Sequence, residues 1–180
     1  MKLRNVVISL LATASVLAFA ITADDFKRER GGKGDEVKNS FEGRALPAME
    51  FDGWLNIDKT PKSWDDLKGK VVLIDFWAHW CGPCRAAVPK MNELYKKFAD
   101  KGLVIVAVHS DKDAEKGKAA VSETKMEFPV AFDIQGKLMK TLGCDSYPDY
   151  VLIDRKGVIR VVDLANGDVP RAVEALINEK

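Results

Sequence analysis

Apolar residues along this 180-residue chain gather into short runs, separated by charged and glycine-bearing segments. Two of the runs, 71–77 and 103–108, are almost wholly apolar, which is typical of strands buried on both faces in the centre of a sheet. Between them, apolar residues recur at helical spacing over 85–99. The succession of strand, helix and strand predicts a βαβ unit within an α/β fold.

Shorter patterns on both sides extend this unit. In chain order, we expect an early strand or hairpin at 49–57, a helical turn at 63–67, a charged helix at 113–125, a short edge strand at 128–132, a short helix at 136–142, an antiparallel hairpin of 150–154 with 158–164, and a closing helix at 169–179. Residues 46–180 therefore predict one compact domain, a central mixed β-sheet with helices on both faces.

Residues 1–23 have the pattern of a targeting segment. Lys2 and Arg4 form a basic start, residues 6–21 are almost wholly apolar, and Ala18-Phe19-Ala20 offers a cleavage site between small residues. We favour a cleaved signal peptide, because the apolar run is short for a bilayer span and hydroxyl side chains dilute it. An uncleaved membrane anchor is the alternative, and either case places the domain outside the cytoplasm.

Residues 24–45 are polar, charged and rich in glycine. Such a composition buries too little apolar surface to order itself, so we expect a flexible linker, with a partner-binding tail as the alternative. Over the whole chain, 28 Lys and Arg balance 27 Asp and Glu, for a net charge of +1. This balance provides no excess of positive charge to attract nucleic acid, so we expect no nucleic-acid partner. We also expect the protein to be a monomer.

Two cysteines lie where the first buried strand gives way to the long helix, in Trp80-Cys81-Gly82-Pro83-Cys84. Unpaired N–H groups and the helix dipole stabilise a thiolate at a helix N-terminus, so Cys81 is the expected nucleophile. Cys84, one turn further on, is placed to resolve a mixed disulfide or to form a disulfide with Cys81. Pro83 suits the first helical turn, and Gly82 lets the backbone turn closely.

Other uses of a Cys-x-x-Cys pair are metal binding and a purely structural bridge. A structural zinc site needs four ligands, whereas the chain has three cysteines, two histidines and no second pair at ligand spacing. Cu(I) bound by two thiolates stays open as a non-enzymatic carrier function. We favour thiol–disulfide exchange, which needs no cofactor because the dithiol itself carries the electrons.

The segment 72–85 resembles the active-site segment of thioredoxins, and the wider sequence is similar to their exported TlpA/ResA-like relatives. The shared features are Lys68-Gly69-Lys70 before the strand, Pro89 inside the helix, and Tyr147-Pro148 before the segment 149–157. The resemblance extends from about residue 46 to the C-terminus. It implies a thioredoxin-like fold, with the extra length at 113–142 as a TlpA/ResA-type αβ insertion.

This resemblance also implies roles for particular residues. A cis Tyr147–Pro148 bond would face the cysteines and offer a backbone edge to a substrate strand. Trp80, Gly82 and Pro83 would contact the same substrate. Asp75 would be a buried carboxyl with a raised pKa that moves a proton to or from Cys84, although a hydrogen-bonded strand aspartate is the alternative.

The sequence departs from the family pattern at three positions. Ala107 stands where thioredoxins carry a lysine beside the buried aspartate, and Ala87 where TlpA/ResA-like proteins often carry a glutamate. Asp149 replaces a common threonine after Pro148, and would raise the pKa of the Cys81 thiol if its side chain pointed there.

Four further side chains near the motif have less specific expectations. We expect His109 to be structural and His79 to be an exposed residue at the end of a strand, with tuning of the Cys81 thiolate as the alternative for His79. Trp77 should pack beneath Trp80. The odd cysteine, Cys144, should be a buried structural thiol, with a second redox role as its alternative.

Together these features predict an exported, periplasmic or extracytoplasmic thiol:disulfide oxidoreductase. The Gly-Pro pair between the cysteines is that of thioredoxin, a reductant at about −270 mV, rather than that of DsbA at about −120 mV. Disulfide-containing extracytoplasmic client proteins and a membrane thiol electron donor are the implied partners, and cytochrome c maturation is one destination that the resemblance suggests. A peroxidase of the peroxiredoxin class is a rival, but residues 75–81 lack its Pro-x-x-x-Thr/Ser-x-x-Cys setting.

Overall fold

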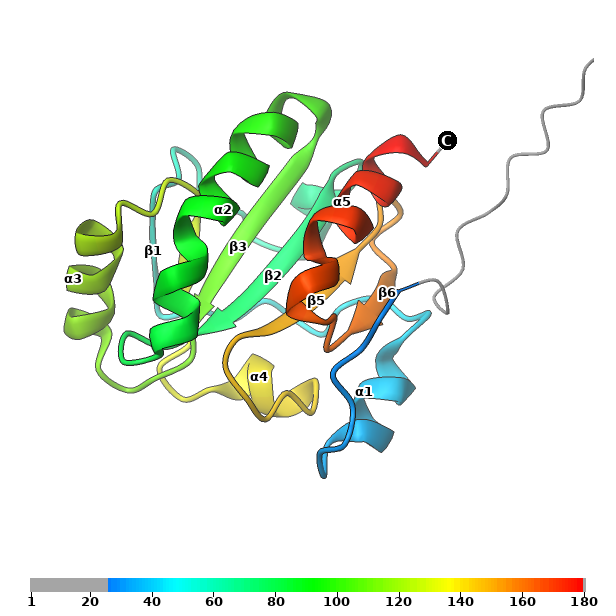
Figure 1. Cartoon of the computed structure of the whole chain (residues 1–180), viewed down its shortest axis with the longest axis horizontal. Coiled ribbons are helices and arrows are strands. Elements are labelled where there is room, and N and C mark those ends of the chain that lie inside the picture. Colours follow the sequence, from blue (N-terminus) through cyan, green and yellow to red (C-terminus); the bar gives the residue numbers. More distant parts are fainter. Residues whose placement is uncertain (1–25, 180) are drawn as a thin grey trace, which may run out of the picture.

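The computed structural model describes residues 26–179, which form a six-stranded mixed sheet (Figure 1). In spatial order the strands are β1 (Gly53–Leu55), β4 (Val130–Phe132), β3 (Leu103–His109), β2 (Val71–Trp77), β5 (Asp149–Ile153) and β6 (Ile159–Val162). The central strands β4, β3 and β2 run parallel, while β1, β5 and β6 pair antiparallel with their neighbours. The sheet thus confirms the predicted mixed topology.

Helices cover both faces of this sheet, as predicted. They are α1 (Asp35–Phe41), α2 (Gly82–Phe98), α3 (Ala114–Thr124), α4 (Lys137–Thr141) and α5 (Val169–Asn178), with 3-10 turns η2 (Trp64–Leu67), η3 (Ala99–Lys101) and η4 (Asn166–Asp168). Apolar side chains of α2, α3 and α5 join the core on one face, and those of α4 and α1 pack on the other. In Figure 1, α2 and α5 cross the front of the sheet.

All seven residues of β2 are buried, which explains the unbroken apolar run in the sequence. Because side chains alternate along a strand, Leu73 and Trp77 pack on the α2 face, whereas Ile74 and Phe76 pack on the opposite face. Asp75 therefore belongs to the α2 face. This register brings a carboxyl group to the side of the sheet that the two cysteines occupy.

The prediction of an edge strand at 128–132 is wrong. The strand β4 pairs with β3 on one side and with β1 on the other, so β1 forms the edge. The three residues of β1 join β4 across more than 70 residues of sequence, in the register Gly53 opposite Phe132. The local pattern of apolar residues indicates that this segment is buried, but it does not indicate which distant strand pairs with it. Between β3 and β5 the chain forms α3, β4 and α4, where the resemblance implies an insertion.

The described part of the predicted flexible linker, residues 26–45, is ordered, which corrects that prediction. Arg28 forms a β-bridge with Leu164, and Ala45 forms one with Val158. Backbone hydrogen bonds and ion pairs, not a broad apolar face, hold the segment, so its composition could not reveal the order. We refer to residues 26–45 as the strap.

The predicted targeting segment 1–23 lies outside the described residues and stays a prediction. Within residues 26–179, no helix combines the length and the apolar character that a membrane crossing requires.

Candidate active site

Cys81 and Cys84 form a disulfide at the start of α2. Cys81 is the N-cap residue, and its sulfur accepts a hydrogen bond from the backbone N–H of Cys84 at 3.1 Å. Both cysteines are buried, at 4% and 5% exposure, while the intervening Gly82 and Pro83 are exposed. The sequence-predicted pair is therefore in its oxidised form at a helix N-terminus, where N–H groups and the helix dipole favour a thiolate after reduction.

Trp80 is the exposed rim of this site, at 61% exposure. Its indole N–H donates to a carboxylate oxygen of Asp111 at 3.1 Å, and its ring meets that of Tyr147 edge to face at 5.5 Å. The Tyr147 hydroxyl in turn donates to the carbonyl of Ser110 at 2.7 Å. The loop after β3 thus fixes both aromatic rings beside the cysteines, whereas Trp77 is buried in the core.

The peptide bond between Tyr147 and Pro148 is cis, as the resemblance implies. Pro148 and Pro83 line one hollow of about 380 Å³, which is largely apolar and also reaches Ala87, Lys90 and Tyr150. The active-site helix and the loop before β5 therefore share a surface. Such a hollow can take an apolar side chain from a bound polypeptide.

The carboxyl group of Asp75 is buried, at 6% exposure. In the register of the sheet, Asp75 lies opposite Ala107 of β3 and Tyr150 of β5, which confirms Ala107 as the neighbour of Asp75. Within residues 26–179, Oδ1 of Asp75 has no hydrogen-bond partner. Burial raises the pKa of Asp75 to about 8.

Asp149 does not face Cys81, which settles the open question of its direction. It pairs with Phe76 and lies on the sheet face opposite the cysteines, with an oxygen 3.7 Å from the ammonium of Lys38. Burial, followed by the nearby negative charge of Asp163, raises the pKa of Asp149 to about 7. Asp149 therefore belongs to a different cluster.

His109 is fully buried against Trp77 and Phe132, in agreement with a structural role. Its Nε2 accepts the backbone N–H of His79 at 3.3 Å, and burial lowers the pKa of His109 to about 4. The side chain of His79 is only 16% exposed and its ring stacks on that of His109, so the expectation of an exposed His79 is wrong.

Cys144 is a free, buried thiol at 6% exposure, as expected of a structural cysteine. Burial and the negative charge of Asp149 raise its pKa. A thiol in this state is a poor nucleophile.

Sequence reasoning missed Asp111 and Lys38. A signal for Asp111 was present, because it follows the end of β3, and the carboxyl ends of adjacent parallel strands converge on one edge of a sheet. Lys38 had no such signal, since it lies in the segment taken for a linker.

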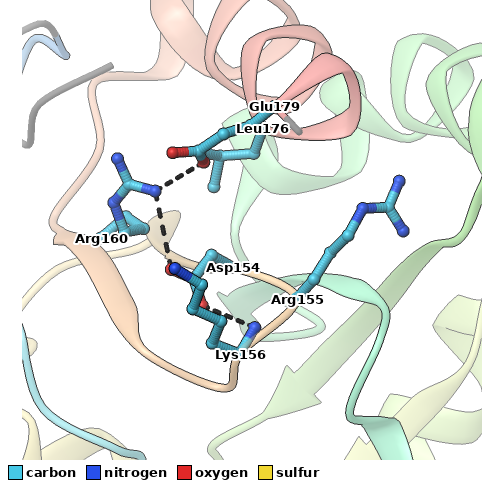
Figure 2. Close-up of a pocket in the computed structure, with 6 residues that line it drawn as sticks. All are labelled: Asp154, Arg155, Lys156, Arg160, Leu176 and Glu179. Atoms are coloured by element: carbon cyan, nitrogen blue, oxygen red, sulfur yellow. Dashed lines mark hydrogen bonds and ion pairs between the residues drawn. The ribbon is translucent and has the colours of Figure 1, made fainter. Parts of the chain in front are cut away.

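A second hollow, of about 120 Å³, lies away from the cysteines, between the β5–β6 turn and α5 (Figure 2). Figure 2 shows Arg160 directed at Asp154 and Glu179, to which it is ion-paired at 3.6 and 2.6 Å. Arg155 is directed away and donates to the carbonyls of Gly69 and Lys101. Arg160, Asp154 and Glu179 thus pair with one another, which fits a structural role.

A central mixed sheet, a disulfide at the start of a helix and a cis-proline beside it define a thioredoxin-like redox protein. The sequence profile of the Redoxin family, described simply as "Redoxin", matches residues 41–176, and the chain belongs to this family. The resemblance predicted from the motif is thereby confirmed.

Named relatives agree with this assignment. The chain is 42% identical over 94 residues to the thiol-disulfide oxidoreductase ResA of Bacillus thuringiensis subsp. konkukian, covering 52% of this chain and 54% of that protein. It is 43% identical over 101 residues to the thioredoxin-like protein YneN of Bacillus subtilis, covering 54% and 58%. A solved structure described as the thiol:disulfide interchange protein DsbE of Chlorobium tepidum superimposes with a TM-score of 0.65 at 33% identity, over 76% of this chain and 94% of that chain. The chain spans about half the length of the curated relatives it matches.

Proposed function

We propose that this protein is an exported thiol:disulfide oxidoreductase that reduces disulfides in extracytoplasmic client proteins through Cys81 and Cys84. The observation that carries the proposal is the Cys81–Cys84 disulfide at the N-terminus of α2, beside the hollow that Pro148 lines. Relatives named as thiol-disulfide oxidoreductase and as thiol:disulfide interchange protein support the same reaction.

In the proposed reaction, the reduced enzyme transfers two electrons to the client. The Cys81 thiolate attacks one sulfur of the client disulfide, whose S–S bond breaks and releases one client thiolate. Cys84, after losing its proton, attacks the Cys81 sulfur, breaks the mixed disulfide and releases the second client thiolate. The client thiolates take up protons, and the enzyme is left with the Cys81–Cys84 disulfide.

Asp75 is the proposed acceptor of the Cys84 proton. Its carboxyl is buried on the α2 face of the sheet, and its pKa of about 8 in the disulfide form means that it holds a proton at neutral pH once Cys84 has been oxidised. Ala107 offers no ammonium group to relay this proton, so we propose that water carries it out of the site.

Five residues are proposed to hold the client chain: the exposed Trp80, Gly82 and Pro83, the half-buried Tyr147, and the buried Pro148. The backbone beside Pro148 would pair with an extended client segment, and the hollow that Pro83 and Pro148 line would receive one of its side chains. Trp80, held by Asp111, would cover the reacting sulfurs on the other side.

The proposal has three further parts. The segment 1–23 directs export, a membrane thiol donor resupplies electrons, and the protein acts as a monomer. The Gly-Pro linker favours the reducing direction. Reduction of apocytochrome cysteines before haem attachment is one process in which such a reductant is needed, and we propose it as a destination for this activity.

Insulin reduction by the full chain, supplied with dithiothreitol, tests the activity. We expect turnover by the wild type and none by Cys81→Ser, whereas Cys84→Ser should accumulate a mixed disulfide, because attack can occur but resolution cannot. Loss of Cys84 with no trapped adduct would contradict the assigned order of attack. Peroxide consumption without insulin reduction would instead favour the peroxidase alternative, and stoichiometric Cu(I) binding without reductase activity the carrier.

Equilibration of the cysteine pair in glutathione or dithiothreitol buffers tests the direction. A potential near the −270 mV of thioredoxin supports a reductase, and one near the roughly −120 mV of DsbA makes the protein a disulfide donor.

A further inference from the structure

Lys38 of α1 is a lysine buried almost completely, at 1% exposure. Its ammonium nitrogen lies 2.8 Å from an oxygen of Asp163, 2.9 Å from one of Asp145 and 3.7 Å from one of Asp149. A buried ammonium group is costly unless anions and hydrogen bonds compensate for its lost hydration. The three carboxylates supply that compensation, and they raise the pKa of Lys38 against the lowering that burial causes.

Two of these carboxylates stand at the two ends of the loop that contains Tyr147 and Pro148. Asp145 comes two residues before Tyr147, and Asp149 comes directly after Pro148 as the first residue of β5. The third, Asp163, directly follows β6. One ammonium group on the strap thus holds both ends of the loop, and joins them to the end of β6.

Close contacts also join the strap to Asp145 and to Gly143, which lies two residues before it. A Cβ added at Gly34 would overlap the carbonyl oxygen of Gly143, and one added at Gly32 would overlap the carboxylate of Asp145. On the other side, a Cβ added at Gly143 would lie 2.9 Å from the Cβ of Val37. The start of α1 and the chain just before the loop therefore approach too closely for a Cβ at Gly34 or at Gly143.

Lys38 also balances a cluster that is otherwise mostly negative. Arg30 of the strap contacts Asp163 at 3.4 Å, and the thiol of Cys144 adjoins Asp149. Without Lys38, the three carboxylates would remain close together, and among the described residues Arg30 would supply the positive charge beside them. Repulsion and the loss of the hydrogen bond from Lys38 to Asp145 would then free the Asp145 end of the loop.

We propose that Lys38 is a positioning residue, through which the strap holds the loop 145–149 in place against Trp80 and the cysteine helix for client binding. The proposal rests on the proposed function in one respect, namely that this loop contacts the client chain. Lys38 itself touches neither the cysteines nor the client. Its effect should therefore appear in the binding of a protein substrate and not in the chemistry of the disulfide.

The test compares Lys38→Met with the wild type in the full chain, using insulin as a protein disulfide and hydroxyethyl disulfide as a small one. We expect KM for insulin to rise about tenfold or more, because a small displacement of a positioning element can cost up to about a hundredfold. The rate with hydroxyethyl disulfide and the reduction potential should not change. Lys33→Met is the matched control, since Lys33 lies exposed on the same strap, and it should behave as the wild type.

Asp145→Asn is the second variant, which decides the matter if Lys38→Met does not fold. Asp145 is 42% exposed and its loss leaves Lys38 paired with Asp163, so the fold should persist while KM for insulin rises severalfold. An unchanged KM in the folded variants would overturn the proposal. Equal losses of activity with insulin and with hydroxyethyl disulfide would overturn it as well, and so would a changed reduction potential of the cysteine pair. Either result would indicate an effect on the whole fold or on the cysteines.

Hydrogen exchange separates this proposal from the proposed function. We expect peptides covering 143–149 to exchange faster in Lys38→Met and Asp145→Asn, with β2 and β3 unchanged. If the wild type fails to reduce insulin, the proposed function fails. Faster exchange confined to the loop would then still support the positioning role, and uniform exchange would exclude it.

Discussion

Asp75 places a carboxyl group in the buried α2 face of the sheet. Its neighbours in the register, Ala107 and Tyr150, provide no cation. Burial is accordingly the cause of the raised pKa of Asp75. Burial also raises the pKa of Tyr150, and the negative charge of Asp75 raises it further. A group of this kind can exchange a proton near neutral pH, which an exposed aspartate cannot do.

Asp75→Asn should slow the resolving step at pH 7 by about tenfold or more, since general bases typically contribute at least that much. The pH dependence that remains should move to higher pH, because Cys84 must then lose its proton to solvent. Single-turnover mixing of the reduced protein with insulin, followed by tryptophan fluorescence, measures this rate. Asp58→Asn, at an exposed aspartate, is the control, and equal rates for the two variants at pH 7 would rule out the proton-acceptor role.

At this scale, the sequence was sufficient to predict the cysteine pair, Trp80, Asp75 opposite Ala107, and the cis bond before Pro148, the last through resemblance alone. It was not sufficient for Asp149. Every residue of β5 is buried, so no polar and apolar alternation marks which face each side chain takes.

At the scale of elements, the strap shows why order can arise without an apolar pattern. Its backbone pairs with the chain on either side of β6, through bridges of Arg28 with Leu164 and of Ala45 with Val158. Arg28 and Arg30 share the carboxylate of Glu42, at 2.7 and 3.1 Å. Each of these contacts joins residues that are distant in sequence or that are polar. The spacing of apolar residues along the chain indicates neither kind of contact. The same reason explains the missed pairing of β1 with β4, whereas the long apolar strands and α2 were predicted.

Gly34→Ala tests whether the strap is packed as closely as the structure indicates. The added methyl group would meet the carbonyl oxygen of Gly143, so we expect a loss of about 1–3 kcal/mol in the free energy of unfolding, the usual cost of overpacking. Gly53→Ala is the control, because a Cβ there has open space. Urea denaturation measures both, and similar midpoints for the two variants would contradict the close contact.

Over the whole molecule, the buried aspartates and the buried histidine affect stability in opposite directions as pH changes. Asp75 and Asp149 have folded pKa values of about 8 and about 7, above the ordinary value of 3.8. The folded state therefore binds more protons than the unfolded state between these limits, and stability falls as pH rises through them. His109, lowered to about 4 from 6.5, has the opposite sign, and its contribution is lost as pH falls from 6.5 towards 4.

Two aspartates outweigh one histidine, so the net effect of these three groups is a decline in stability from about pH 4 to pH 8. Acidic residues with lowered pKa values affect stability at lower pH. The Arg171 guanidinium lowers the pKa of Asp168, so the contribution of Asp168 to stability is lost only as pH falls below the ordinary pKa of an aspartate. We therefore expect the oxidised protein to unfold at a higher temperature at pH 5 than at pH 8. This is the reverse of what paired surface carboxylates would give.

The double variant Asp75→Asn/Asp149→Asn should remove this decline, with each single variant removing part of it. The two side chains lie on opposite faces of the sheet and share no partner, so their effects should be close to additive. The gain in stability should therefore be largest at pH 8 and should vanish near pH 4. Thermal unfolding of the oxidised protein across pH 4–9, followed by circular dichroism, measures these differences. If the curves of the wild type and the double variant ran parallel over that range, neither carboxyl could be titrating with a raised pKa, and the proposed storage of a proton on Asp75 would fail with it.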